Sequence, residues 1–404
     1  MKKKILFGLL AMTAISANGQ ETYENANLMK PELTGTARYI GMGGAMEALG
    51  ADISTISTNP AGIGLFRSSS ANISFGLSSQ QDVTTYGADH KTVPSFDQAG
   101  FVYSMRTNSN SFLNFAFNYS KSRNFNQILN AVGNLNGSSQ NKLTYNKFAS
   151  NDDFLYFDKD GTILSDYIQF SQLDYLYANN INYEEDADGN GTFYGYDGDA
   201  YDMYRAQSGY IGRYDFNISG NVNNRFYWGI TVGLQDVHYN GFSDYIETLG
   251  NSTVEVMDTR KITGNGVDIK AGIIFRPVAE SPFRIGLSVS TPTWYELKTS
   301  NYTSMSLLNS GVSQELYDPD INESYEFKLY TPWKFGASLG HTVGNNLALG
   351  LSYETVQSSE TVQSSEAVFP SAIFSSSVTV FSSATVSSSL AVFSSATEFA
   401  SISF

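Results

Sequence analysis

The sequence predicts an all-β protein, a transmembrane antiparallel β-barrel, and three observations lead to this fold class. The chain starts with a segment typical of an export signal, and no later segment offers the roughly 18 consecutive apolar residues that a membrane-spanning helix needs. Many segments instead alternate between apolar and polar residues, as strands with two different faces do. An exported protein of this kind is either a soluble β protein or a barrel that crosses a membrane with strands.

The first 19 residues, "MKKKILFGLLAMTAISANG", have the parts of a secretory signal. Lysines at positions 2–4 precede an apolar stretch at 5–15 that is too short for a resident membrane helix. Ala17 and Gly19 supply the small residues of a signal-peptidase site, so we expect cleavage after Gly19. A buried N-terminal helix is the alternative, but it leaves the three consecutive lysines unexplained.

Composition also favours a barrel. The 404 residues include 26 Tyr, 27 Phe and 35 Gly but only 16% charged residues, and the mean hydropathy of −0.21 is too polar for a helical membrane protein. A barrel has this balance because half of each strand faces away from lipid. The formal net charge is −15, or −18 without the three signal lysines, which argues against nucleic acid as a partner. The absence of cysteine excludes a disulfide framework and a lipidated cysteine.

The alternation is clearest in "SFLNFAFNYS", residues 111–120, where Phe115 and Phe117 share one face and Asn114 and Asn118 share the other. The same pattern predicts three hairpins, with strands at 213–220 and 226–234, at 267–275 and 283–290, and at 335–339 and 347–354. Earlier strands are predicted at 71–79 and 99–106.

A β-sandwich would show the same alternation, with the apolar face turned to a core. Two features favour the barrel. The alternating runs have about nine to eleven residues, the length that a tilted strand needs to cross a bilayer. The polar faces carry Gly, Ser and Asn together with charges such as Asp268 and Lys270, which suit a lumen.

The predicted connections are of two kinds, as in barrels with short periplasmic turns and long extracellular loops. Tight turns are expected at "NVNN" and "GNN". The longest connection runs from about residue 123 to 207 and is rich in Asn, Asp and Tyr.

The segment ahead of the first strand is rich in glycine. Residues 36–50, "TARYIGMGGAMEALG", predict a short helix whose small residues permit close packing. In the following "STNPAG", Asn59 can cap a second helical turn that begins at Pro60. Taken alone, "NPAG" is also a common loop turn.

In its setting, after a signal and ahead of strands, this segment resembles the N-terminal hatch of the FadL family of outer-membrane transporters. The resemblance rests on "GMGGAMEALGADISTISTNPAG", in which Asn59, Pro60 and Ala61 match the NPA motif of the family and are followed by Gly62. It extends to "STPTWYELKTSNY" and "FKLYTPWKFGASLG", and covers residues 34–354.

The resemblance implies a barrel of about 14 strands with a signal at 1–19, a hatch at 20–68 and the barrel at 69–354. It implies a protein of the outer membrane of a Gram-negative bacterium, not an enzyme. Such a protein takes up hydrophobic compounds such as long-chain fatty acids passively and releases them sideways through its wall into outer-membrane lipid. Family members can also act as surface scaffolds or secretion-associated docking proteins, which is the alternative function. The oligomeric state does not follow from the sequence.

Other motifs are weaker. The segment "DADGNGTFYGYD" places Asp186, Asp188, Asn190 and Asp197 at calcium-ligand positions, but Asp replaces the usual final Glu and no helices flank it, so a solvated acidic loop is the preferred interpretation. The glycines of "GMGGAM" lack the βαβ context of a dinucleotide site. The three histidines are far apart, and no catalytic triad is evident. We therefore expect no catalytic residue, no metal and no cofactor, with calcium as the one weak candidate.

The last 50 residues, 355–404, differ from the rest of the chain. They contain 17 serines and no Gly, Asn, Asp, Tyr, Lys or Arg, and the segment "ETVQSSE" is repeated at once. Such low-complexity sequence need not pack a core. Because the family would have further ordinary strands here, we expect that the barrel is incomplete at its C-terminal end. A frameshift into a repetitive reading frame, a truncated gene or a real alternative ending would each produce such a tail.

Overall fold

The computed structural model describes residues 28, 32–85, 90–149, 156–157, 163–164, 173–174, 176–177, 181–185, 187, 189, 191–309, 312–316, 324–344, 347–357, 363–364 and 386–394. The predicted signal at 1–19 lies outside the described residues.

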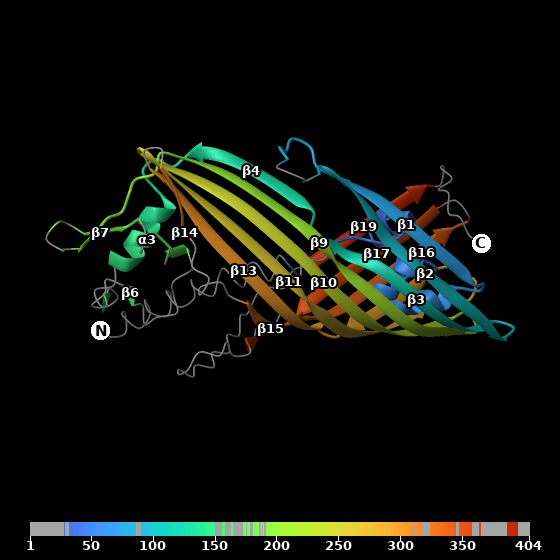
Figure 1. Cartoon of the computed structure of the whole chain (residues 1–404). Helices are drawn as coiled ribbons and strands as arrows, with labels where there is room; N and C mark the ends of the chain where they lie inside the picture. The colour runs from blue at the N-terminus through green and yellow to red at the C-terminus, as the bar shows by residue number, and fades with distance from the viewer. Residues whose placement is uncertain are drawn as a thin grey trace, which may run out of the picture.

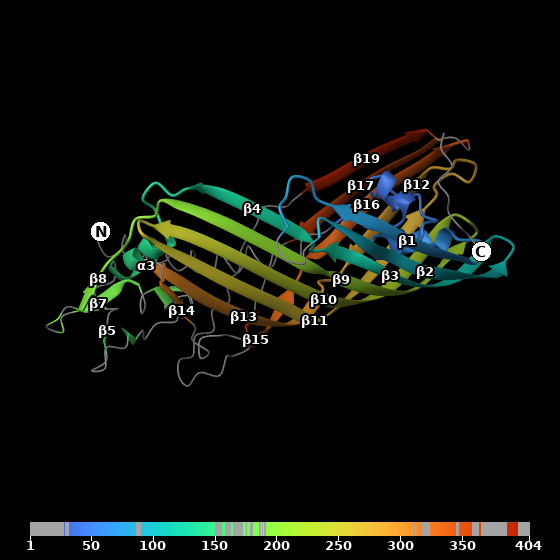
Figure 2. The same cartoon turned by 45° about the horizontal axis from the view of Figure 1, so that its top comes forward.

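One large antiparallel sheet of 15 strands dominates the molecule, which confirms the predicted all-β class (Figure 1). Its main path is β1-β2-β3-β9-β10-β11-β12-β16-β17-β19. Five further strands, β4, β13, β14, β15 and β18, pair beside this path. The sheet is a curved wall in both views (Figure 2). Within the described residues nothing pairs β1 with β19, so the wall is not closed into a barrel.

The strands of the sheet have the following bounds: β1 (Ser70–Ser79), β2 (Thr92–Asn108), β3 (Ser111–Asn124), β4 (Gln127–Asn134), β9 (Ala200–Val222), β10 (Phe226–Leu249), β11 (Ser252–Phe275), β12 (Arg284–Ser290), β13 (Trp294–Asn309), β14 (Val312–Leu316), β15 (Ser324–Tyr330), β16 (Trp333–Val343), β17 (Leu347–Gln357), β18 (Gln363–Ser364) and β19 (Val386–Ser394).

The three predicted hairpins are confirmed as the antiparallel pairs β9–β10, β11–β12 and β16–β17. The turn between β9 and β10 lies slightly later than predicted, because Asn221 still belongs to β9. Asn223 and Asn224 form the turn with positive φ angles of 55° and 52°, a conformation that Asn tolerates better than most residues.

The expected strand length of nine to eleven residues is wrong for the centre of the sheet. Strands β9, β10 and β11 have 23, 24 and 24 residues. The apolar alternation marks only the part of each strand with one apolar face. Beyond it β10 continues as "DVHYNGFSDY", in which both faces carry polar residues and the period-two signal is lost.

Where the alternation holds, the two faces of the wall differ as predicted. The outer face bears exposed apolar side chains on every long strand, including Phe101, Phe115, Phe216, Val232, Ile269, Leu287, Phe335 and Leu351. The inner face bears buried polar ones, including Asn114, Asn118, Asp215, Asn217, Ser219, Thr231, Asp268 and Lys270.

Short helices precede the sheet and pack against its inner face. They are α2 (Ala37–Gly41) and the 3₁₀ helices η1 (Ile53–Ser57) and η2 (Pro60–Leu65). The helix predicted over 36–50 is therefore shorter than expected. Gly43 and Gly44 take positive φ angles of 59° and 79°, which end the helix in a series of turns. The cap predicted at Asn59 is confirmed, since its side chain accepts a hydrogen bond from Ala61 N and Pro60 begins η2.

The segment 123–207 is more structured than the predicted loop. It begins with the end of β3 and with β4, ends in the first part of β9, and contains α3 (Gln140–Ala149). Two small hairpins complete it, β5 (Tyr156–Phe157) with β6 (Ile163–Leu164) and β7 (Tyr183–Glu185) with β8 (Gly191–Phe193). In the described residues no helix is long and apolar enough to span a membrane.

The serine-rich tail is only partly described. Strand β17 extends past the predicted boundary at 354 to Gln357, and β19 pairs with β17 as the last strand of the main path. The compositional break at residue 355 is therefore not a break in the sheet.

Candidate functional site

Residues 36–66, here called the inner segment, lie against the wall through a set of wall glycines. A Cβ added to Gly286 would lie 3.0 Å from Asn59 Nδ2, and one added to Gly340 would lie 3.0 Å from Leu49 N. On six different strands a glycine allows the inner segment to approach in this way: Gly100, Gly229, Gly272, Gly286, Gly340 and Gly350. Any larger side chain at these positions would move the inner segment away from the wall.

Wall side chains also satisfy backbone carbonyls of the inner segment. Asn114 Nδ2 donates to Ile63 O at 2.7 Å, and Asn221 Nδ2 donates to Gly64 O at 3.2 Å. Thr231 Oγ1 donates to Ile56 O at 3.0 Å. Because the carbonyl groups at the end of a short helix keep free acceptor capacity, these donors hold the segment in one orientation.

The NPA motif lies at the centre of these contacts. Asn59 and Ala61 are fully buried, and Ala61 packs with Tyr227 and Ile274 of the wall. The backbone of Pro60 lies against Gly229. Gly62 O accepts a hydrogen bond from Ala51 N at 3.0 Å, which ties the motif to the preceding turn. The residues Asn59, Pro60, Ala61 and Gly62 thus form one buried unit against β10 and β11.

Next to the inner segment, farther along the same strands, the inner face carries a buried ion network. Arg213 Nε lies 2.9 Å from Asp215 Oδ1, and its NH2 group lies 3.5 Å from Asp268 Oδ1. Lys270 Nζ pairs with the same Asp268 carboxylate, and Gln235 Nε2 donates to its other oxygen at 2.7 Å. Two cations and two carboxylates balance in charge, which limits the cost of burying them.

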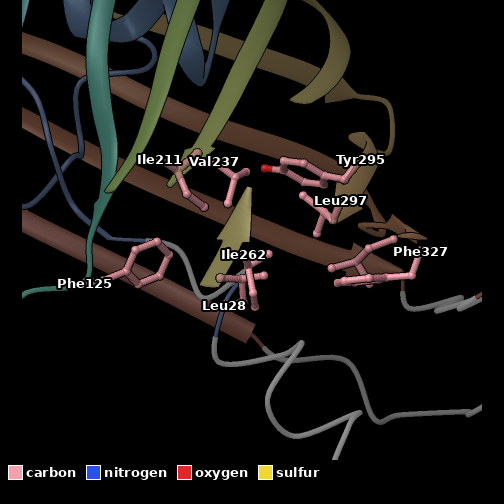
Figure 3. Packing of buried hydrophobic residues seen from close by; sticks show 9 residues of the cluster. Leu28, Phe125, Ile211, Val237, Ile262, Tyr295, Leu297 and Phe327 are labelled. Carbon is pink, nitrogen blue, oxygen red and sulfur yellow. The ribbon is translucent and has the colours of Figure 1, made fainter. Parts of the chain in front are cut away.

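Beyond the ion network the inner face becomes apolar. Side chains from β9, β10, β11, β13 and β15 point toward one another and toward Leu28 (Figure 3). This apolar cluster comprises Leu28, Phe125, Ile211, Val237, Ile262, Tyr295, Leu297, Phe327 and Leu329. Along β10 the order is therefore inner segment at Gly229 and Thr231, ion network at Gln235, and apolar cluster at Val237.

Farther along β10, the segment that contains α3 packs on the ends of the long strands. The buried carboxylate of Glu247 accepts a hydrogen bond from Gln140 N at 2.7 Å, at the start of α3, and others from the hydroxyls of Tyr177 and Tyr245. Apolar residues that include Leu176, Leu249 and Met305 pack beside it.

The wall has a seam between β2 and the strands β3 and β4. Pairing of β2 with β3 stops at Gln98 and Ser120, although β2 continues beside β1 as far as Thr92. Strand β3 also continues, beside β9, to Asn124. Bulges in the β1–β2 and β3–β9 ladders occur at this level, and bulges twist strands away from their neighbours.

Hydrogen bonds that involve side chains cross this seam at three places in the described residues. Lys121 Nζ donates to Ser95 Oγ at 2.7 Å, and Thr84 N donates to Asn130 Oδ1 at 2.9 Å. Between them Gln80 makes two bonds to one residue: Ile128 N donates to Gln80 Oε1 at 2.6 Å, and Gln80 Nε2 donates to Ile128 O at 3.3 Å.

Two cavities meet at the seam. The larger has a volume of about 760 Å³ and extends from Gln80 across β9, β10, β11 and β13. The smaller has about 390 Å³ and reaches Phe125 of the apolar cluster. The residues that line both cavities are Ser78, Gln80, Asn126, Gln127 and Gln207.

Of the four calcium-loop candidates only Asp197 is described. Asp186, Asp188 and Asn190 lie outside the described residues. Asp197 is described and forms an ion pair with Lys142 of α3. Among the described residues no group of three or more His, Asp or Glu side chains is placed to hold a metal ion.

Sequence reasoning missed the seam and the apolar cluster. The sequence predicts a connection at Phe125, which does lie between β3 and β4, but it does not indicate that this side chain packs into the cluster. Neither bulge has a sequence signal. One signal for the apolar cluster is present in β10: Val237 and Tyr239 follow the polar Gln235 on the inner face, so this face changes from polar to apolar there.

No family model matches the sequence, and no curated protein matches it. Among solved structures, the chain is similar to the toluene transporter TbuX of Ralstonia pickettii, with a TM-score of 0.42 and 13% identity over 92% of this chain and 81% of that one. It is also similar to a FadL homologue of Pseudomonas aeruginosa, with a TM-score of 0.41 and 12% identity over 83% and 72% of the two chains. The toluene transporter TodX of Pseudomonas putida follows with a TM-score of 0.36 and 11% identity over 82% and 73%. One of these solved structures is thus a homologue of FadL. The sequence motifs described above resemble the same family.

Proposed function

We propose that the protein is an outer-membrane transporter that takes up hydrophobic compounds, such as long-chain fatty acids, without energy coupling and releases them sideways through its wall. In this proposal the inner segment is the hatch. The exposed apolar rows on the outer face fit a lipid environment, and the polar inner face fits a lumen.

The observation that carries the proposal is the apolar cluster beyond the ion network. An apolar molecule gains about 25 cal/mol for each Å² that it removes from water, so a lumen with an apolar lining offers it a favourable site. The smaller cavity reaches this cluster at Phe125, which gives such a molecule room to approach.

Sideways release has a separate support. The inner segment packs closely against six wall glycines, and the ion network lies directly next to it. An apolar molecule would have to displace buried charges in order to move along the lumen. The seam, where backbone pairing is interrupted, offers a path that does not cross the ion network.

The experiment measures uptake of tritiated oleate and of radiolabelled toluene by liposomes that contain the purified full chain. Leu297→Asn places an amide in the apolar cluster and should lower uptake about tenfold, because a buried polar group without a partner is costly. The matched control is Leu308→Asn on the same strand, since Leu308 is 45% exposed and Leu297 only 2%.

Uptake of neither compound by folded wild-type protein would contradict transport. The alternative, a surface scaffold or secretion-associated docking protein, would then be preferred, and a membrane location would be tested by whether the protein sediments with outer membranes after a carbonate wash.

A further inference from the structure

We propose that the Gln80 carboxamide is a detachable latch of the wall, which holds the β1–β2 hairpin to β4 and separates the two cavities at the seam. The latch rests on the proposed function in one respect, namely that the molecules that pass through the opened seam are hydrophobic compounds.

The geometry of the two bonds explains why a glutamine fits this position. A carboxamide has one donor and one acceptor group, as a peptide group has, and Gln80 directs them to the carbonyl and the N–H of the same residue, Ile128. In an antiparallel sheet a neighbouring strand would make such a pair of bonds with its backbone. Gln80 therefore replaces one rung of the missing ladder between the hairpin and the edge of β4.

A side chain is easier to detach than a strand. Rotation about the side-chain bonds of Gln80 breaks both hydrogen bonds without moving its backbone, whereas opening a ladder requires the separation of many paired residues. The cavities provide space on both sides for the released side chain, because Gln80 lines each of them.

Two further bonds keep the seam together when the latch is open. The Lys121–Ser95 bond lies where the pairing of β2 and β3 ends, and the Thr84–Asn130 bond lies two residues beyond Ile128 on β4. Release of Gln80 therefore opens the seam between these two points and leaves the strands in place. The opening joins the smaller cavity, which reaches Phe125 of the apolar cluster, to the larger one.

The test compares Gln80→Ala with the matched control Gln127→Ala. Gln127 lines the same two cavities, but the two hydrogen bonds to Ile128 across the seam are made by Gln80. Amide hydrogen exchange of Ile128 in the full-length protein reports the latch directly, because its N–H donates to Gln80 Oε1. Loss of the two bonds should speed this exchange about 5- to 100-fold in Gln80→Ala and leave it unchanged in Gln127→Ala.

A second variant, Gln80→Glu, retains the size of the side chain. Its carboxylate still accepts from Ile128 N but faces Ile128 O without a donor, so exchange should lie between that of wild type and that of Gln80→Ala. The same proteins are loaded into liposomes, and the rate of transfer of tritiated oleate is measured. Faster exchange should be accompanied by faster transfer.

The outcomes separate the two proposals. If exchange of Ile128 is unchanged in Gln80→Ala, the latch is wrong, whether or not oleate is transferred. If exchange rises while a transporting protein transfers oleate at an unchanged rate, the latch does not control passage and is also wrong. If exchange of Ile128 rises in Gln80→Ala but neither this variant nor wild type transfers oleate or toluene, the latch stands and the proposed transport function is contradicted.

Discussion

The inner segment and the β1–β2 hairpin are held to the wall by the same kind of bond, a side-chain amide paired with a backbone group. Asn114 and Asn221 hold the inner segment in this way, and Gln80 holds the hairpin. Their surroundings differ. The asparagines act where backbone packs against wall glycines, whereas Gln80 is bordered by a cavity on each side.

The difference shows that surroundings, more than the bonds themselves, decide whether a contact is permanent. In either place a single hydrogen bond from a side-chain amide contributes only about 1 kcal/mol to stability. Close packing adds many small contacts that are lost together when the inner segment moves. At the seam little is lost besides the two hydrogen bonds of Gln80. We therefore expect changes near the inner segment to affect stability, and changes at the seam to affect local opening.

The largest effect is expected from the ion network beside the inner segment. Asp268→Asn leaves Arg213 and Lys270 with only Asp215 as a counter-charge and should lower the free energy of unfolding by about 3–5 kcal/mol. The measurement is urea-induced unfolding in lipid vesicles, followed by tryptophan fluorescence. The double variant Asp268→Asn with Lys270→Met restores the charge balance and should regain most of the loss. Equal destabilisation in the single and double variants would show that charge balance is not the cause.

A smaller effect is expected from Glu47 of the inner segment. Burial, together with the nearby charge of Glu354, raises the pKa of Glu47 from its usual value of 4.5 to about 7. Because the folded protein binds this proton more tightly than the unfolded chain, stability should fall as the pH rises from 4.5 to 7 and change little above that. The total change is on the order of 3 kcal/mol.

The measurement for Glu47 is protection of the inner segment from hydrogen exchange between pH 4.5 and 8, corrected for the intrinsic exchange rate. Glu47→Gln should remove the pH dependence and keep protection high throughout. A variant with the same slope as wild type would assign the dependence to another group.

The smallest effect is expected from a single methyl group. Gly229→Ala would press a Cβ against the backbone of Pro60 and Ala61 and should destabilise the inner segment by about 1–3 kcal/mol. The measurement is the rate of proteolysis within residues 36–66. Gly212→Ala on β9 is the matched control, because its Cβ would make only ordinary contacts at 3.4 Å. Similar rates in both variants would contradict the close-packing argument.

The sequence predicted the parts of the fold that depend on local pattern. Phe115 and Phe117 are on the outer face and Asn114 on the inner face because alternation alone decides this. Asn59 caps a turn at Pro60 because both signals are adjacent in the chain. The charges Asp268 and Lys270 were correctly placed on the inner face for the same reason.

The rest depends on contacts between distant residues. Gln80 binds Ile128, 48 positions later, and nothing in the local sequence of either residue indicates the other. The role of Gly229 becomes evident only when Pro60 lies against it. The part of β10 beyond Gln235 is not predicted as a strand, because polar residues on both of its faces remove the periodicity.

The ladders of β10 with β9 and with β11 have no register shift over their whole length. One residue inserted into β10 ahead of Gly229 would exchange the two faces of the strand beyond it, so that the positions of Gly229, Gln235 and Val237 would turn outward. Two inserted residues would preserve the faces and only change the spacing between the layers. Length variation tolerated within this strand should therefore occur in even steps, and any odd step should come with a bulge that restores the phase.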